Sequence, residues 1–437
     1  MSLALPTSLM RTICALCCTI LAVELCADEN VCRTSDGKAF RGLLVGFSEQ
    51  GHPVFDTNIG SNTVPLDELL YWGGLHDSPD GTQVLLADGS LIVAADVQLD
   101  GEMLLVRSRL FGEVEGFSIN GLSRLPISAV RAIVFRAPLR PADRDQLLKR
   151  LQTVADAEDQ LWLANGDVLK GTISRLAREN QDDKPGPMTV VIKADAGDVE
   201  IRAEQPQGGL LEKVQAIAFN PALVRKVDQN SPALLVGLSD GTRLYAKQID
   251  ADGERATFTL VSGVKLTSHP DEDIWRKISS LQSFGPHVKY LSGLSPADYR
   301  HQPMLERKWP LGRDESVTGS RLRTAGRMFV KGLGMHSSAR AVYVLDQPYA
   351  RLEAELAIDE SAGKEGSVLF LVAHDAGGKF KIAYKSPIIR GGDPPVPISL
   401  DVTGARRIAL FVEEADHGKV LDRANWLDAR LIPVVRE

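Results

Sequence analysis

The chain has 437 residues, which is too long for one small hydrophobic core, so we expect several domains. Its formal net charge of −7 leaves no excess of basic residues, which argues against a nucleic-acid partner. With 44% hydrophobic and 24% charged residues, the composition is that of a folded protein rather than a disordered one.

The N-terminus has the layout of a secretory signal peptide. Arg11 precedes an apolar run from Ile13 to Leu25, and Ala27 is suited to the position before a cleavage site. The run is too short for a comfortable membrane span. We therefore expect residues 1–27 to be removed. The mature protein would be secreted, or would lie in the periplasm or cell envelope, without a transmembrane span. A retained N-terminal anchor is the alternative, and a lipoprotein ranks third.

The cysteines follow the same division. Four of the five cysteines lie within the predicted signal peptide, and Cys32 is the one that remains. A single cysteine cannot form an internal disulfide and cannot supply a cysteine metal site. The mature protein must therefore be stabilised by its hydrophobic cores.

A short turn pattern recurs four times between residues 34 and 250. Each copy pairs an aspartate or asparagine with a glycine and is followed by an apolar strand: Asp36-Gly37, Asp88-Gly89, Asn165-Gly166 and Asp240-Gly241. Such dipeptides suit tight turns with positive φ between antiparallel strands. They predict two small β modules in residues 28–138 and two in residues 161–285, each an SH3-like barrel or sheet. The alternative is that the turns mark β-hairpins without homologous repetition.

One helix interrupts these strands. Pro141 is suited to the first turn of a helix that we expect over Ala142 to Glu158, within a linker of residues 139–160. Its apolar positions follow the helical period and form one face: Leu147, Leu148, Leu151, Val154 and Ala155.

The last third of the chain reads as an all-β sandwich. Three segments alternate apolar and polar residues with the two-residue period of a half-buried strand: Leu352 to Ile358, Ile398 to Val402 and Ile408 to Val412. The run from Val368 to Ala373 is apolar on both faces and predicts a central strand. Gly and Pro separate these runs, and helical periodicity is nearly absent.

Two longer runs bracket this region, from Gly326 to Ser337 and from Asp422 to Leu431. Together with Trp309 and the segments Gly366–Phe370 and Leu400–Gly404, they resemble the NPCBM family of carbohydrate-binding modules, which often accompany glycoside hydrolases. The resemblance implies a jelly-roll β-sandwich over residues 287–434 that binds a glycan. The predicted fold class is thus all-β: a C-terminal jelly roll preceded by tandem small β modules and one linking helix.

A sugar ring offers an apolar C–H face that stacks on aromatic rings and hydroxyls that bind planar polar groups. Beside the matched runs, the candidate ligand-binding residues are Trp309, Lys331, His336, Asn425, Trp426 and Asp428. For Trp426 the alternative is a core aromatic residue, and for His336 it is a structural hydrogen bond.

Asp422 and Asp428 flank Trp426 and are the candidate metal ligands, for a structural calcium ion. The alternatives for both are contact with sugar or capping of backbone amides. Asn425 stands where the family often has an aspartate, which removes one charge from any cation site.

Sequence motifs for catalysis are missing: there is no Gly-x-Ser-x-Gly elbow, no phosphate loop and no His-Glu-x-x-His. The strands show no alternation with helices that would build a catalytic barrel. We therefore expect a secreted or envelope-associated, non-catalytic carbohydrate-binding protein. The alternatives are a structural or protein-interaction scaffold without sugar binding, and a glycoside hydrolase with its active site in residues 34–280. Such an enzyme needs two carboxylates across a cleft, and the 57 acidic residues neither nominate nor exclude a pair.

Overall fold

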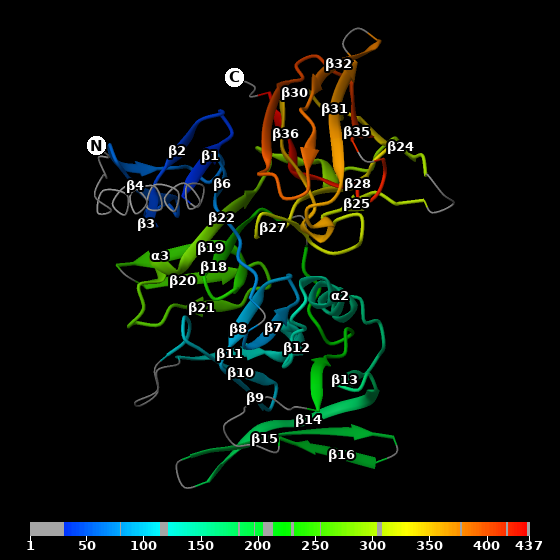
Figure 1. The fold of residues 1–437 in the computed structure, drawn as a ribbon. Helices are drawn as coiled ribbons and strands as arrows, with labels where there is room; N and C mark the ends of the chain where they lie inside the picture. The colour runs from blue at the N-terminus through cyan, green and yellow to red at the C-terminus, as the bar shows by residue number, and fades with distance from the viewer. Residues whose placement is uncertain are drawn as a thin grey trace, which may run out of the picture.

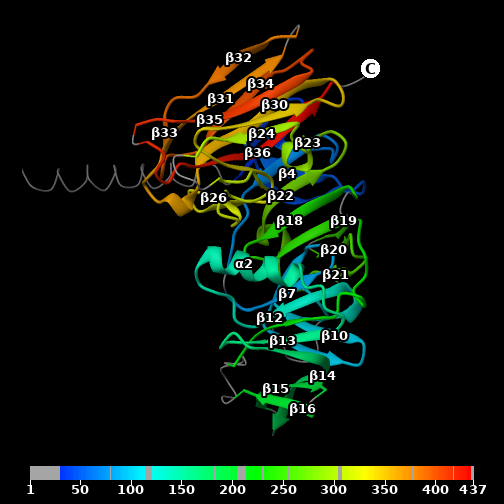
Figure 2. The same ribbon diagram turned by 90° about the vertical axis from the view of Figure 1, so that its right-hand side faces the viewer.

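The computed structural model describes residues 30–78, 80–113, 121–181, 184–195, 197–203, 213–228, 231–253, 255–303, 308–375, 378–416 and 418–434. The predicted signal peptide, residues 1–27, lies outside these ranges. The described chain forms two parts, which we name the N-terminal β body (residues 31–284) and the sandwich (residues 289–433). Figures 1 and 2 show the sandwich at one end of an elongated molecule and the hairpin of β14 (Val168–Gln181) and β15 (Lys184–Ala194) at the other. Within the described ranges, no helix is long and apolar enough to cross a membrane. Cys32 is buried and unpaired.

The N-terminal β body is built on one continuous hydrogen-bonded path of strands rather than on separately closed sheets. Its order is β16 (Gly197–Arg202), β15 (Lys184–Ala194), β14 (Val168–Gln181), β13 (Asp159–Leu163), β17 (Val214–Ala218), β12 (Val130–Val134), β7 (Thr82–Leu86), β8 (Leu91–Ala94), β19 (Arg243–Asp252), β18 (Ala233–Leu238), β22 (Ile278–Phe284), β6 (Leu69–Gly73), β1 (Val31–Thr34) and β2 (Ala39–Arg41). Antiparallel pairs between strands that lie far apart in the sequence, such as β12 with β17 and β18 with β22, make this path continuous.

Smaller sheets extend this path. β19 also pairs with β20 (Arg255–Leu260), which pairs with β21 (Lys265–Thr267). Two three-stranded sheets complete the N-terminal β body: β11 (Gly121–Pro126), β10 (Met103–Ser108) and β9 (Asp96–Asp100), and β3 (Leu43–Phe47), β4 (Pro53–Thr57) and β5 (Gly60–Thr63).

The four predicted turns share one geometry. In each, the glycine has a φ of 88° to 95°, a region that side chains with a Cβ rarely adopt. In each, the preceding Asp or Asn accepts a hydrogen bond from the amide two residues later, at 2.8 to 3.1 Å: Asp36, Asp88, Asn165 and Asp240. Gly51 and Gly263 close two further turns of the same backbone form, in which Gln50 and Ser262 occupy the Asp/Asn position. The sequence pattern missed these two because it required Asp or Asn before the glycine.

Helix α2 (Pro141–Gln152) begins where Pro141 predicts but is shorter than expected. Leu147, Leu148 and Leu151 are buried against the sheet, as the apolar face requires. The helix ends at Gln152 because Thr153 turns back on it: its hydroxyl and its amide both bond to the carbonyls of Lys149 and Arg150. The expectation of a helix to Glu158 was therefore wrong for its last six residues. A short second helix, α3 (Ile274–Lys277), precedes β22.

The C-terminal part is a β-sandwich, which confirms the predicted fold class. One sheet has the order β25 (Gly312–Arg313), β28 (Gly332–His336), β36 (Arg423–Pro433), β30 (Tyr349–Ile358) and β34 (Val396–Asp401), with β23 (Lys289–Tyr290) beside β36. The facing sheet has the order β24 (Asp298–His301), β29 (Ala339–Val344), β35 (Arg407–Glu414), β31 (Ser367–Asp375) and β32 (Phe380–Lys385), with β33 (Ile389–Arg390) beside β31. The four predicted strands are β30, β34, β35 and β31, and β31 has neighbours on both sides as expected. A two-stranded ribbon, β26 (Leu322–Thr324) and β27 (Arg327–Phe329), projects from the sandwich towards α2.

A buried ion cluster joins the two parts. The guanidinium of Arg323, on β26, bonds to both oxygens of Asp145 on α2 and lies 2.6 Å from Oδ2 of Asp77. Arg144 binds the same Asp77 oxygen at 2.8 Å. Burial acts to raise the pKa of Asp77, but hydrogen bonds from Arg144 and Arg323 outweigh it and lower the pKa. Asp77 is therefore ionised at neutral pH, and the ion cluster holds α2 against the sandwich.

Removing one side chain of the buried ion cluster should lower the free energy of unfolding far more than removing a neighbouring surface charge. We expect Asp145→Ala to lower the free energy of unfolding by about 3–5 kcal/mol, because Arg323 is left buried with fewer counter-charges. Asp143→Ala, an exposed carboxylate on the same helix, is the matched control and should have little effect. Urea unfolding followed by tryptophan fluorescence measures both. Equal effects of the two substitutions would contradict the importance of the cluster.

Candidate functional site

Two of the predicted ligand residues meet at one end of the sandwich. The imidazole of His336, the last residue of β28, lies parallel to the indole of Trp309, with ring centroids 5.2 Å apart and an angle of 2° between the planes. A second imidazole, that of His301 at the end of β24, meets His336 edge-on at 5.6 Å. His336 is buried, whereas Trp309 and His301 are partly exposed. We call this group the His–Trp–His cluster.

Local hydrogen bonds fix the cluster in place. The backbone amide of Trp309 donates to Nδ1 of His301 at 3.2 Å, and the hydroxyl of Tyr299 donates to the carbonyl of Trp309 at 3.1 Å. Since Nδ1 of His301 accepts a hydrogen bond, the neutral ring carries its proton on Nε2. That Nε2 atom, and Nδ1 of His336, are buried without a hydrogen-bond partner among the described residues.

Both imidazoles of the cluster are neutral at physiological pH. Burial, with a smaller contribution from His301, lowers the pKa of His336 to about 4. Burial and the nearby Lys419 lower the pKa of His301 as well. A neutral imidazole has one N–H donor and one acceptor nitrogen. The cluster therefore combines a partly exposed aromatic ring with unused donor and acceptor atoms.

No pattern in the sequence singles out His301. It lies 35 positions before His336 (336 minus 301), in a strand of the facing sheet. The pairing of β24 with β29 and the link through Trp309 bring the two rings together. No spacing rule for metal or catalytic histidines covers such a contact.

Two other predicted ligand residues lie in the interior. Trp426, on β36, has no exposed surface, and its ring meets that of Phe370 on the facing sheet edge-on at 5.0 Å. Asn425 is equally buried, and its amide donates to Oδ2 of Asp359 at 2.7 Å. The expectation that these two contact a ligand is corrected, because neither offers a surface to solvent. Trp426 is the core aromatic residue that the alternative described.

Lys331 and Asp428 face the N-terminal β body instead of the His–Trp–His cluster. They are neighbours, since the amide of Asp428 donates to the carbonyl of Lys331 at 3.0 Å. Lys331 precedes the five residues of β28 and His336 ends them, which separates the two by roughly 16 Å in an extended strand. Nζ of Lys331 pairs with Asp314 at 2.8 Å, and Oδ1 of Asp428 accepts from Gln282 at 3.0 Å. The predicted ligand set therefore does not form one site.

The two candidate metal ligands are also separated. Asp422 lies just before β36 and Asp428 in its middle, which corresponds to roughly 20 Å in an extended chain. Oδ1 of Asp422 accepts from the amide of Ser367 at 2.9 Å, as the capping alternative described. Within the described residues, no group of three or more His, Cys, Asp or Glu side chains could hold a metal ion. The expected pairing of these carboxylates around calcium is corrected.

The burial of Trp426 leads to a direct stability prediction. Trp426→Ala should lower the free energy of unfolding by about 3–5 kcal/mol, the usual cost of deleting a large buried aromatic side chain. Trp309→Ala, which truncates a partly exposed ring, should lower the free energy of unfolding clearly less. Denaturant unfolding of both variants provides the comparison, and a stable Trp426→Ala protein would contradict the assignment to the core.

Asp428 should make stability depend on pH. Burial raises the pKa of this carboxyl to about 6, although Arg430 acts to lower it. The folded protein thus binds the proton more tightly than the unfolded chain, so this group's contribution becomes less favourable as pH rises from about 4 to about 6. Asp428→Asn should therefore stabilise the protein by about 1–3 kcal/mol at pH 8 and much less at pH 4.5. Asparagine keeps the acceptor for Gln282 and tolerates the φ of 48° found here.

The control substitution should change the stability in the opposite direction. The amide of Thr403 bonds to Asp401 and is the main reason that the pKa of Asp401 is lowered, so Asp401→Asn should lose stability at pH 8 rather than gain it. Melting temperatures at the two pH values test both variants. A destabilising effect of Asp428→Asn at pH 8 would contradict the prediction.

The sandwich matches a domain family, and part of the chain is similar to known proteins. A curated protein from Renibacterium salmoninarum, provisionally named an endo-alpha-N-acetylgalactosaminidase, is 23% identical over 188 residues, which cover 43% of this chain and 11% of that protein. The chain thus spans about a tenth of the length of this relative. Among solved structures, CBM51-2 with the INT domains of Clostridium perfringens ZmpB, in complex with GlcNAc, is 23% identical, covers 44% of this chain and 42% of that chain, and has a TM-score of 0.30.

A second solved structure, CBM51 from Clostridium perfringens GH95 in complex with methyl-galactose, is 21% identical, covers 33% of this chain and 99% of that chain, and has a TM-score of 0.29. The resemblance to the NPCBM family noted from the sequence is confirmed. Residues 287–432, which comprise the sandwich, match the NPCBM/NEW2 domain.

Proposed function

We propose that this protein is a non-catalytic glycan-binding protein, and that the His–Trp–His cluster of the sandwich holds a neutral sugar. The observation that carries the proposal is a pair of imidazole nitrogens without a hydrogen-bond partner in the described part of the chain, beside a partly exposed indole ring. Buried polar atoms usually have partners, and an unused pair next to an accessible aromatic ring is the arrangement that a bound hydroxyl would complete. The match of residues 287–432 to a family of carbohydrate-binding modules supports the same function.

The chemistry of the cluster favours an uncharged sugar. Trp309 can pack against the apolar C–H face of a pyranose. Nε2–H of His301 is a donor for a sugar oxygen, and the ring of His336 can exchange a second hydrogen bond with a hydroxyl. Both imidazoles are neutral, because burial lowers the pKa of each. A charged ligand would find no counter-ion among these three side chains.

The proposed location is outside the cytoplasm. The apolar run after Arg11 is the basis for export. The partner would be a polysaccharide or glycoconjugate of the cell envelope or the surroundings.

Catalysis is not part of the proposal. Glycoside hydrolysis needs two carboxylates that face each other across a cleft and are free to act on the substrate. Asp88 and Asp314 line the large cleft between the two parts of the chain, but both accept hydrogen bonds from the protein's own donors. The glycosidase name of the Renibacterium salmoninarum relative belongs to a protein of which this chain matches 11%.

Binding by single-site variants tests the function. A screen of neutral glycans would identify a ligand, and titration calorimetry would then measure its affinity for the wild type and for Trp309→Ala and His336→Ala. Each hydrogen bond to sugar replaces one to water and contributes only about 0.5–1.5 kcal/mol, so Trp309→Ala should weaken binding more than His336→Ala. Trp309→Ala, which truncates a partly exposed ring, should lose less stability than His336→Ala, which removes a buried one, so melting temperatures are measured beside binding.

Tyr384→Ala is a suitable control, because Tyr384 is a partly exposed aromatic residue on β32, on the facing sheet. It should bind the ligand as the wild type does. Normal binding by both Trp309→Ala and His336→Ala would refute this site. Failure of the wild-type protein to bind any neutral glycan would refute the function and favour a scaffold role.

A further inference from the structure

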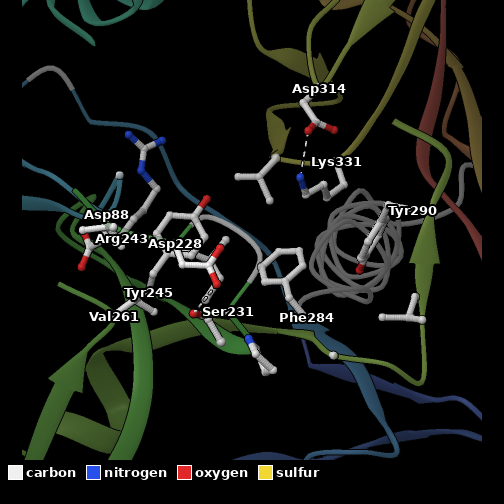
Figure 3. A pocket seen from close by; sticks show the side chains of 18 of the residues that line it. Asp88, Asp228, Ser231, Arg243, Tyr245, Val261, Phe284, Tyr290, Asp314 and Lys331 are labelled. Atoms are coloured by element: carbon white, nitrogen blue, oxygen red, sulfur yellow. Dashed lines mark hydrogen bonds and ion pairs between the residues drawn. The ribbon is translucent and has the colours of Figure 1, made fainter. Parts of the chain in front are cut away.

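A cleft suited to a second ligand lies where the N-terminal β body meets the sandwich. A cleft of about 880 Å³ opens there, within the usual range for small-molecule sites of roughly 300–1,000 Å³. Figure 3 shows its two walls: Arg243 and Tyr245 come from β19, while Asp314 and Lys331 come from the sandwich. Phe284, at the end of β22, lies between them.

Arg243 is the unusual residue of this cleft. It is 94% buried (6% exposed), yet within the described chain no carboxylate pairs with it. Its Nη1 atom donates to the sulfur of Met328 at 3.4 Å, a weak acceptor. Arg321 also donates to this sulfur, at 3.5 Å, but Arg321 has Asp145 as a counter-ion. Buried charges are normally paired, because an unpaired charge that is removed from water loses its hydration without a compensating interaction.

The carboxylates that line the same cleft are already engaged. Asp88 accepts two backbone hydrogen bonds at 2.8 Å, from Ser90 and Ser262. Asp314 accepts from Lys331 and from the amide of Gly332. Asp228 accepts from Ser231 at 3.4 Å. Arg243 is therefore the buried cation of this cleft for which the described residues supply no carboxylate.

The surroundings of Arg243 select the kind of anion. A guanidinium presents a planar fork that matches a carboxylate through two parallel hydrogen bonds. Beside it, the rings of Tyr245 and Phe284 lie 6.2 Å apart at 36° and are both partly exposed, which offers apolar surface to the face of a sugar ring. On the other wall, the ion pair of Lys331 and Asp314 supplies a donor and an acceptor for hydroxyls.

We propose that this cleft binds an acidic oligosaccharide, with the carboxylate of a hexuronate residue on Arg243 and its ring against Tyr245 and Phe284. This site is separate from the His–Trp–His cluster and does not depend on the function proposed for it. The protein would then hold a neutral sugar at the far end of the sandwich and an acidic one at its junction with the N-terminal β body.

Two acidic probes test the proposal by titration calorimetry on the whole mature chain: trigalacturonate and a hyaluronan tetrasaccharide. The methyl ester of trigalacturonate has the same skeleton without the charges and serves as the ligand control. We expect at least one acid to bind, and its ester or Arg243→Met to weaken binding roughly ten- to hundredfold, the effect of losing a charge-assisted pair. Arg243→Lys, which keeps the charge but loses the fork, should give an intermediate affinity.

Stability and a second variant separate ligand binding from a structural role. Arg243→Met should melt at the wild-type temperature or above it, because it removes a buried charge that lacks a carboxylate. Tyr384→Ala, a substitution on the facing sheet outside both proposed sites, should bind the acid as the wild type does. The proposal is overturned if neither acid binds, if acid and ester bind equally, or if Arg243→Met binds normally or unfolds at a much lower temperature. It is also overturned if sodium sulfate binds as tightly as the acid, which would make this a simple anion site.

Discussion

The buried contact of Arg323 with Asp145 and Asp77 determines how the two parts of the molecule are arranged. Arg323 comes from a short ribbon of the sandwich, and its two carboxylate partners come from the N-terminal β body. A buried guanidinium needs its counter-charges in one geometry, because each displaced partner leaves an unpaired charge out of water. The ribbon is therefore held against α2. The same contact joins the N-terminal β body, which carries Arg243, to the sandwich, which carries Lys331.

Strand β36 has a comparable role inside the sandwich. It pairs with β28 and β30 and carries Trp426 into the core between the sheets. Asn425 shows how its polar residues are adapted to the interior. Its amide donates to Asp359, which an aspartate at position 425 could not do without protonation. The motif around Trp426 thus owes its pattern to packing and to buried hydrogen bonds rather than to direct ligand contact.

The two proposed binding sites use different electrostatics. In the His–Trp–His cluster, burial lowers the pKa of both imidazoles, so the site offers hydrogen bonds without charge. In the cleft between the N-terminal β body and the sandwich, Arg243 stays charged, since a guanidinium does not deprotonate at physiological pH. The same physical factor, removal from water, therefore makes one site suited to a neutral sugar and the other to an acidic one.

The sequence alone determined the local features of this protein, because local features depend on short-range rules. Alternation at Leu352–Ile358 marked a strand, Asp-Gly pairs marked turns with positive φ, and Pro141 marked the start of α2. The matched runs around Gly332 and Trp426 indicated the sandwich. Tertiary structure decided what these rules do not reach: that His301 joins His336, that Trp426 faces inward, and that Asp422 and Asp428 lie apart. It also placed Lys331 opposite Arg243. Such contacts depend on strand register and on the packing of one part of the chain against another, and neither is written in the spacing of residues along the sequence.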